Sequence, residues 1–170
     1  MRLVSSSSSG RRFLLETAAL TRPEPHTKHA SNWYNFWGTP LCRVFHIATL
    51  YAFGSRGREI RALVEQGQPL EPGPSDVDIG VRPIPGTHLS VQQKVRLAIA
   101  LEDLFDVGRV DLVCLPEADP FLAANVVRGE RLYARDEYEA DEYDLYVLRR
   151  AGDLAPLERE RMALILGEQS

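Results

Sequence analysis

Short segments rich in β-branched and aromatic residues alternate with amphipathic segments along this chain, and that alternation limits the folds open to it. Three such segments read as strands: 47–53 (IATLYAF), 77–82 (VDIGVR) and 109–115 (RVDLVCL). Residues 91–105 place their apolar side chains on one broad face, which predicts a helix capped by Ser90 and stopped at Gly108. Strands alternating with helices predict an α/β (α+β) fold, in which helices pack against a small mixed sheet.

Further helices are predicted around this framework. One ends at 41–45, another spans 58–65, and the C-terminal part holds stretches near 120–128, 137–150 and 155–166. Asp153 is a candidate cap for the last of them. Residues 67–74 contain three prolines and two glycines and are predicted to form turns.

At 170 residues the chain has the length of a single domain. Its start differs in composition, with a serine run at 5–9 followed by scattered arginine and proline. We therefore expect residues 1–31 to be a disordered extension and residues 32–170 to form the folded domain with its C-terminal helices.

Charge, hydropathy and cysteine content exclude several classes of protein. A net charge of -4 gives no chain-wide footprint for duplex nucleic acid. No uninterrupted apolar run exceeds five residues, whereas a membrane-spanning helix needs roughly 20. The two cysteines, Cys42 and Cys114, provide no disulfide scaffold, so we expect a cytoplasmic protein without a membrane segment.

The dipeptide Gly54-Ser55 directly follows the first strand and precedes a predicted helix. A glycine at this point lets phosphate oxygens approach the backbone, while the helix N-terminus and the serine hydroxyl supply donors. By itself, the dipeptide is a weak signal and is more typical of a plain turn.

Acidic residues mark the second and third strands. Residues two apart in a strand share a face, so Asp76 and Asp78 of Ser75-Asp76-Val77-Asp78 point together, with Gly80 leaving room beside them. The alternative is a half-exposed strand whose polar residues face water. Asp111, flanked by Val110 and Leu112, needs a pairing partner, a metal or solvent; a core hydrogen-bond acceptor would also explain it.

Together these features indicate one mechanism. Three carboxylates could hold two Mg²⁺ ions, with Mn²⁺ as the alternative metal, because hard oxygen ligands suit both. A phosphate-compatible turn nearby would then place a triphosphate for in-line attack.

Three segments together resemble the motifs of the polymerase-β-like nucleotidyltransferases, and specifically the minimal nucleotidyltransferase (MNT) family with its antitoxin members. They are Phe53-Gly54-Ser55-Arg56, Ser75-Asp76-Val77-Asp78-Ile79 and Val110-Asp111-Leu112-Val113. Residues 125–136 resemble the segment that follows the third acid in the family, so the similarity covers roughly 41–136.

The resemblance implies a role for each matching residue. Asp76 and Asp78 would ligate both metals, and Asp111 would complete one metal site and orient or deprotonate the attacking hydroxyl. Gly54 and Ser55 would contact the β- and γ-phosphates of ATP. Arg56 is an extra candidate phosphate contact, with a surface side chain of no special role as the alternative, and Ser75 joins the nucleotide-binding residues. One departure from the family is the longer stretch between Ser55 and Ser75.

The resemblance also implies an acceptor, a tyrosine of a partner HEPN-family toxin that would receive AMP. Residues 136–144 (DEYEADEYD) hold six acids and could offer a charged helix face to that partner, or could pack on the protein's own sheet. Homo- or hetero-oligomers are compatible with this partner. The alternatives are a catalytically weak antitoxin that acts by binding alone, or nucleotidyl transfer to a small molecule such as an aminoglycoside.

Overall fold

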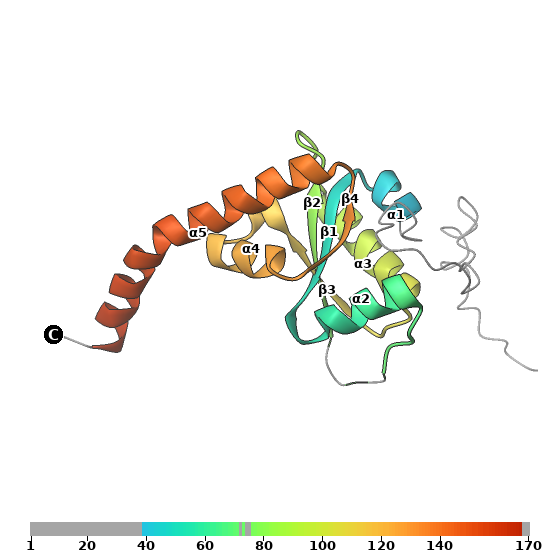
Figure 1. Ribbon diagram of the computed structural model, residues 1–170, viewed down its shortest axis with the longest axis horizontal. Helices are drawn as coiled ribbons and strands as arrows, with labels where there is room; N and C mark the ends of the chain where they lie inside the picture. Colours follow the sequence, from blue (N-terminus) through green and yellow to red (C-terminus); the bar gives the residue numbers. More distant parts are fainter. Residues whose placement is uncertain (1–38, 72, 74–75, 168–170) are drawn as a thin grey trace, which may run out of the picture.

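The computed structural model describes residues 39–71, 73 and 76–167, so the expected extension at 1–31 lies outside the described part of the chain. Four strands form one sheet with helices on both of its faces, which confirms the expected fold class (Figure 1). The elements, in chain order, are α1 (Thr39–Val44), β1 (Ile47–Phe53), the 3-10 turn η2 (Gly54–Arg56), α2 (Gly57–Gln66), β2 (Val77–Pro83), α3 (Val91–Phe105), β3 (Val110–Cys114), the 3-10 turn η3 (Leu115–Glu117), α4 (Pro120–Val127), β4 (Glu130–Ala134) and α5 (Glu137–Leu166).

The sheet is mixed, with the strand order β3-β2-β1-β4. β1 is antiparallel to both β2 and β4, whereas β2 and β3 run parallel and are joined by the crossover helix α3. Helices α2 and α3 cover one face of the sheet, and α4 and α5 cover the other (Figure 1). The end of β1 and the beginnings of β2 and β3 therefore meet at one end of the sheet.

Side chains alternate along β2 as the sequence predicts. Val77, Ile79 and Val81 are fully buried in the core formed with α2 and α3. Gly80 lies on the opposite face, but it leaves no room beside the acids, because a Cβ atom there would come within 2.1 Å of Val126 Cγ1 on α4. The expectation of free space at Gly80 is therefore wrong: α4 packs directly onto it.

Two helix ends differ from the sequence expectation. α3 begins at the Ser90 capping box as predicted, but it ends at Phe105 with Asp106 as its cap: Asp106 has a left-handed backbone (φ 56°), and its N–H donates to the carbonyl of Glu102. Gly108 is therefore not the stop. The two helices predicted at 137–150 and 155–166 are one 30-residue helix, so Asp153 caps nothing.

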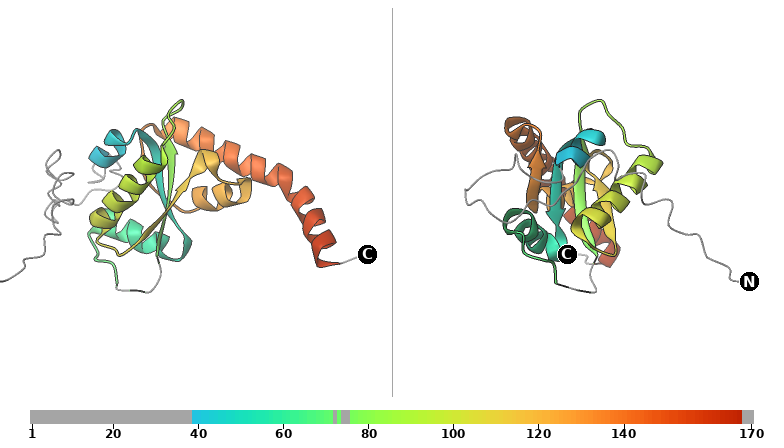
Figure 2. Two further views of the ribbon diagram at one scale, coloured as in Figure 1. Left: turned by 180° about the vertical axis from the view of Figure 1, so that it is seen from behind. Right: turned by 90° about the vertical axis from the view of Figure 1, so that its right-hand side faces the viewer.

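α5 continues through Pro156, a residue that usually ends a helix. The helix bends along its length, and its C-terminal part extends away from the sheet (Figures 1 and 2). Four leucine and isoleucine side chains on this part are each more than 60% exposed: Leu157, Leu164, Ile165 and Leu166. None of the helices in the described part of the chain is long and apolar enough to span a membrane.

Candidate active site

Two of the three predicted acids lie side by side at the end of the sheet. Asp78 of β2 is the register partner of Asp111 on the parallel strand β3, so their side chains leave the same face of adjacent strands. Asp76 lies just before β2 and is also partly exposed. α4 covers this face at Gly80, two residues further along β2, whereas the three acids are each partly exposed.

The Gly54-Ser55 turn lies against Asp78. β1 and β2 are antiparallel with Phe53 opposite Asp78, so the residue after Phe53 meets the acid. The backbone of Gly54 has φ +68°, and a Cβ atom on it would lie 2.2 Å from Asp78 Oδ2. The backbone angle therefore favours glycine here, and a larger residue would also displace the carboxylate of Asp78.

The long stretch from Ser55 to Ser75 does not move this turn away from the acids. Its first part is the helix α2 (Gly57–Gln66), which begins directly after η2. The side chain of Arg56 is buried, with 8% of the residue exposed, and it donates to the carbonyl of Glu71 at 2.8 Å and pairs with Glu59 at 3.1 Å. Arg56 thus connects the segment after α2 to the start of that helix and is not a surface side chain without a role. Its predicted phosphate contact stays a prediction, and Ser75 lies outside the described residues.

Arg109 brings Asp76 into the group and was not singled out from the sequence. Its Nη2 atom lies 2.9 Å from Asp111 Oδ1, and its Nε atom lies 3.5 Å from Asp76 Oδ2. The signal for it was present, because residues two apart in a strand point to the same side and Arg109 precedes Asp111 by two. A guanidinium therefore lies between two of the three carboxylates.

The third carboxylate, Asp78, lies in an environment that disfavours its ionised form. Partial burial, followed by the charges of Asp111 and Asp76, raises the pKa of Asp78 above its ordinary value. Clustered carboxylates of this kind attract a cation, and oxygen donors of this type suit Mg²⁺ or Mn²⁺. Within 39–71, 73 and 76–167, however, no three acidic, histidine or cysteine side chains converge closely enough in this arrangement to hold a metal. The donor set fits a divalent cation, provided that the side chains around Arg109 rearrange.

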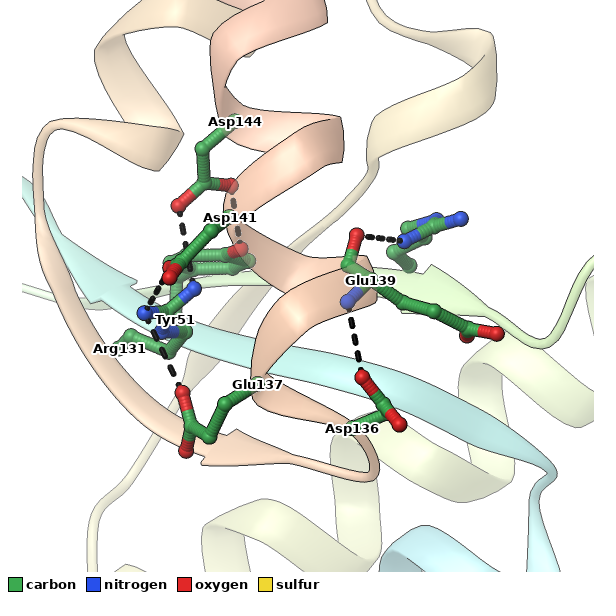
Figure 3. Close-up of polar contacts among 8 residues, drawn as sticks. Tyr51, Arg131, Asp136, Glu137, Glu139, Asp141 and Asp144 are labelled. Carbon is green, nitrogen blue, oxygen red and sulfur yellow. Dashed lines mark hydrogen bonds and ion pairs between the residues drawn. The ribbon is translucent and has the colours of Figure 1, made fainter.

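Most acidic side chains of the segment 136–144 contact other residues of the protein itself (Figure 3). Arg131 of β4 reaches Asp141 at 2.6 Å, Glu137 at 3.3 Å and Asp144 at 3.5 Å. The Tyr51 hydroxyl donates to Asp144 at 2.6 Å. The structure thus favours the alternative interpretation for these residues, namely that this face of α5 packs on the protein's own sheet.

Replacing Tyr51 with Phe should therefore destabilise the protein. Tyr51 is fully buried, and the change leaves the half-buried Asp144 carboxylate without this donor. We expect urea unfolding to show a loss of about 1–3 kcal/mol. Tyr138→Phe, at a side chain that is 75% exposed on the same helix, should change stability by less than about 0.5 kcal/mol. Equal effects of the two substitutions would contradict this assignment.

Comparison with known proteins gives matches among solved structures only. No family model matches the chain, and no curated protein matches it. A toxin–antitoxin complex with AMP-PNP shares 22% identity over 82% of this chain and 100% of that chain, with a TM-score of 0.56. An MntA–HpeT toxin–antitoxin mutant shares 23% identity over 77% and 94% of the two chains, with a TM-score of 0.54.

A third structure contains tri-AMPylated Shewanella oneidensis HEPN toxin with MNT antitoxin, and its matching chain shares 23% identity over 77% and 92% of the two chains, with a TM-score of 0.51. At these identities the similarity concerns the fold. The chain has the fold of the matching chain in each of these structures, and the fold expected from its three motifs is confirmed.

Proposed function

We propose that this protein is an MNT-family nucleotidyltransferase that transfers AMP from ATP to a hydroxyl acceptor with the help of a divalent metal. The observation that carries the proposal is the meeting of Gly54 with Asp78 and of Asp78 with Asp111. A turn suited to phosphate and a set of carboxylates suited to a metal thus share one end of the sheet.

Asp76, Asp78 and Asp111 would hold two Mg²⁺ ions, or Mn²⁺, which would neutralise charge on the triphosphate. The backbone of Gly54 and the hydroxyl of Ser55 would bind the β- and γ-phosphates, with Arg56 and Ser75 as further candidates. The acceptor oxygen attacks the α-phosphorus of ATP. The bond between this phosphorus and the oxygen that leaves with pyrophosphate breaks, and the proton of the acceptor hydroxyl passes to Asp111 or to solvent. The products are the AMP ester, pyrophosphate and a proton.

For the acceptor we propose a tyrosine of a HEPN-type toxin, so that the protein acts as an antitoxin in the cytoplasm. Solved complexes of the same fold support this choice, since one of them contains a tri-AMPylated HEPN toxin beside its antitoxin. The exposed apolar side chains on the C-terminal part of α5 also suit a protein partner.

An assay of label transfer tests the proposal directly. The protein is incubated with α-³²P-labelled ATP, MgCl₂ and the product of the neighbouring gene, and labelled protein is then resolved by gel. We expect label on a tyrosine of the partner, and no label when Mg²⁺ is replaced by EDTA or when the protein carries Asp76→Asn.

Label transfer, measured together with neutralisation of the toxin, separates the alternatives. An antitoxin that acts by binding alone would neutralise the toxin with equal strength in its wild-type and Asp76→Asn forms and transfer no label. Transfer to an aminoglycoside would label the drug and leave the partner unlabelled. Either result would overturn the proposed acceptor, and label that survives Asp76→Asn would overturn the proposed site.

A further inference from the structure

The backbone of Arg109 is held in place by the sheet, whereas its charged end is largely exposed. Its carbonyl accepts a hydrogen bond from the N–H of Val77 at 3.2 Å, which fixes the backbone beside the start of β2. The side chain is 65% exposed. Its Nε and Nη2 atoms both contact Asp111 Oδ1, at 3.1 Å and 2.9 Å, and Nε also reaches Asp76.

The charges at this end of the sheet explain why a guanidinium lies there. Asp78 is the register partner of Asp111, and Asp76 shares Arg109 with Asp111, so three negative charges lie at this end of the sheet and repel one another. Arg109 compensates two of them, Asp76 and Asp111, whereas the third, Asp78, is the one packed against Gly54. An exposed guanidinium that compensates charge in this way can leave at a modest energetic cost.

A divalent metal would need the same oxygens. Hard cations take carboxylate oxygens directly at short distance, and a guanidinium already on those oxygens would be repelled by the ion. We infer that Arg109 is the counter-ion of Asp76 and Asp111 while no metal is bound, and that a divalent cation displaces its guanidinium from both. This inference rests on the metal site of the proposed function.

Binding of Mn²⁺ alone to the full chain tests the displacement. Titration calorimetry, or the electron paramagnetic resonance signal of free Mn²⁺, gives the affinity without nucleotide or turnover. Arg109→Gln removes the competing cation and should bind Mn²⁺ at least about three-fold more tightly than the wild-type protein. Arg109→Lys keeps the charge but loses the planar guanidinium, so its affinity for Mn²⁺ should lie between those of the wild-type protein and Arg109→Gln.

A second measurement distinguishes displacement of the Arg109 guanidinium from the effect that a change of net charge has on metal affinity. In the ¹⁵N spectrum of the wild-type protein, the Nε–H signal of Arg109, assigned by its absence in Arg109→Gln, should shift and lose protection from solvent exchange as Mg²⁺ is added. An unchanged signal at saturating Mg²⁺, or an affinity of Arg109→Gln equal to or weaker than that of the wild-type protein, would overturn the inference.

Failure of the inference and failure of the proposed function give different results. If the wild-type protein binds Mn²⁺ and Asp78→Asn does not, the metal site stands, and the Arg109 variants alone decide the displacement. If neither the wild-type protein nor Arg109→Gln binds Mn²⁺ in the presence of AMP-PNP or without it, both the metal site and the displacement are wrong. Binding by Arg109→Gln and not by the wild-type protein would be the strongest support for competition.

Discussion

Replacing Asp78 with Asn is expected to lower AMP transfer by at least about 10³-fold, because this acid is shared between the two halves of the proposed site. It adjoins the Gly54 turn on one side and Asp111 on the other. Asparagine keeps the shape of the side chain but cannot balance the charge of a metal. Initial rates of label transfer at saturating ATP and Mg²⁺ measure the loss.

The same substitution should not destabilise the metal-free protein at neutral pH. Partial burial and the neighbouring acids raise the pKa of Asp78 in the folded state, so its ionisation there is less favourable than in the unfolded chain. Above the folded-state pKa the ionised group therefore lowers stability, and Asp78→Asn removes that penalty. The stability advantage of the variant, measured in EDTA, should disappear as the pH falls through the raised pKa towards 3.8, the ordinary value.

Asp103→Asn is the matched control for Asp78→Asn. Asp103 is exposed on α3, on the other side of the sheet, so the substitution removes the same charge away from the site. We expect full transfer activity from this variant. A similar loss of activity in both variants, or a pronounced drop in melting temperature for Asp78→Asn alone, would contradict the assignment of Asp78.

Local signals in the sequence determined which elements could be predicted. The bounds of β1 agree with the predicted strand because every residue of it is buried and Gly54 ends it. The start of α3 agrees because Ser90 and Gln93 form a capping box, which acts within four residues.

The elements that were missed depend on distant contacts. β4 is a five-residue strand that carries Glu130 and Arg131, and only its pairing with β1 makes it a strand. Pro156 predicts a break in the helix, yet the 30-residue helix α5 continues through it. A single proline therefore does not determine where this helix ends. Neither outcome can be read from a window of neighbouring residues.

For the candidate site, the period of two along a strand predicted that Asp76 and Asp78 would share a face. The structure places Asp78 beside Asp111 and Asp76 just before the start of β2. What the sequence could not give is the register between strands. The parallel pairing of β2 and β3 aligns Asp78 with Asp111, and the antiparallel pairing of β1 and β2 brings Gly54 to Asp78. The close contact between turn and acid is therefore a property of the sheet.

Gly54→Ala should separate the geometry of the site from the stability of the fold. A Cβ atom at residue 54 would lie 2.2 Å from Asp78 Oδ2, so the carboxylate must move. That oxygen is the end of a flexible side chain, and its displacement costs little stability but misplaces a ligand of the proposed site. Since an error of about 1 Å can reduce catalysis about 10²-fold, we expect kcat/KM for AMP transfer to fall by that order.

Gly67→Ala is the matched control, because Gly67 has nearly the same backbone angle, φ +67° against +68°, and no atom of the described residues lies within 4 Å of its Cβ position. Both alanines should lower the free energy of unfolding by about 1–2 kcal/mol, the cost of a left-handed backbone. Only Gly54→Ala should lose transfer activity, and a metal at the acids should bind more weakly to it. If the two variants lose activity equally, backbone strain and not contact with Asp78 would explain the loss. The proposal that the phosphate-binding turn and the metal-binding acids form one site would then be wrong.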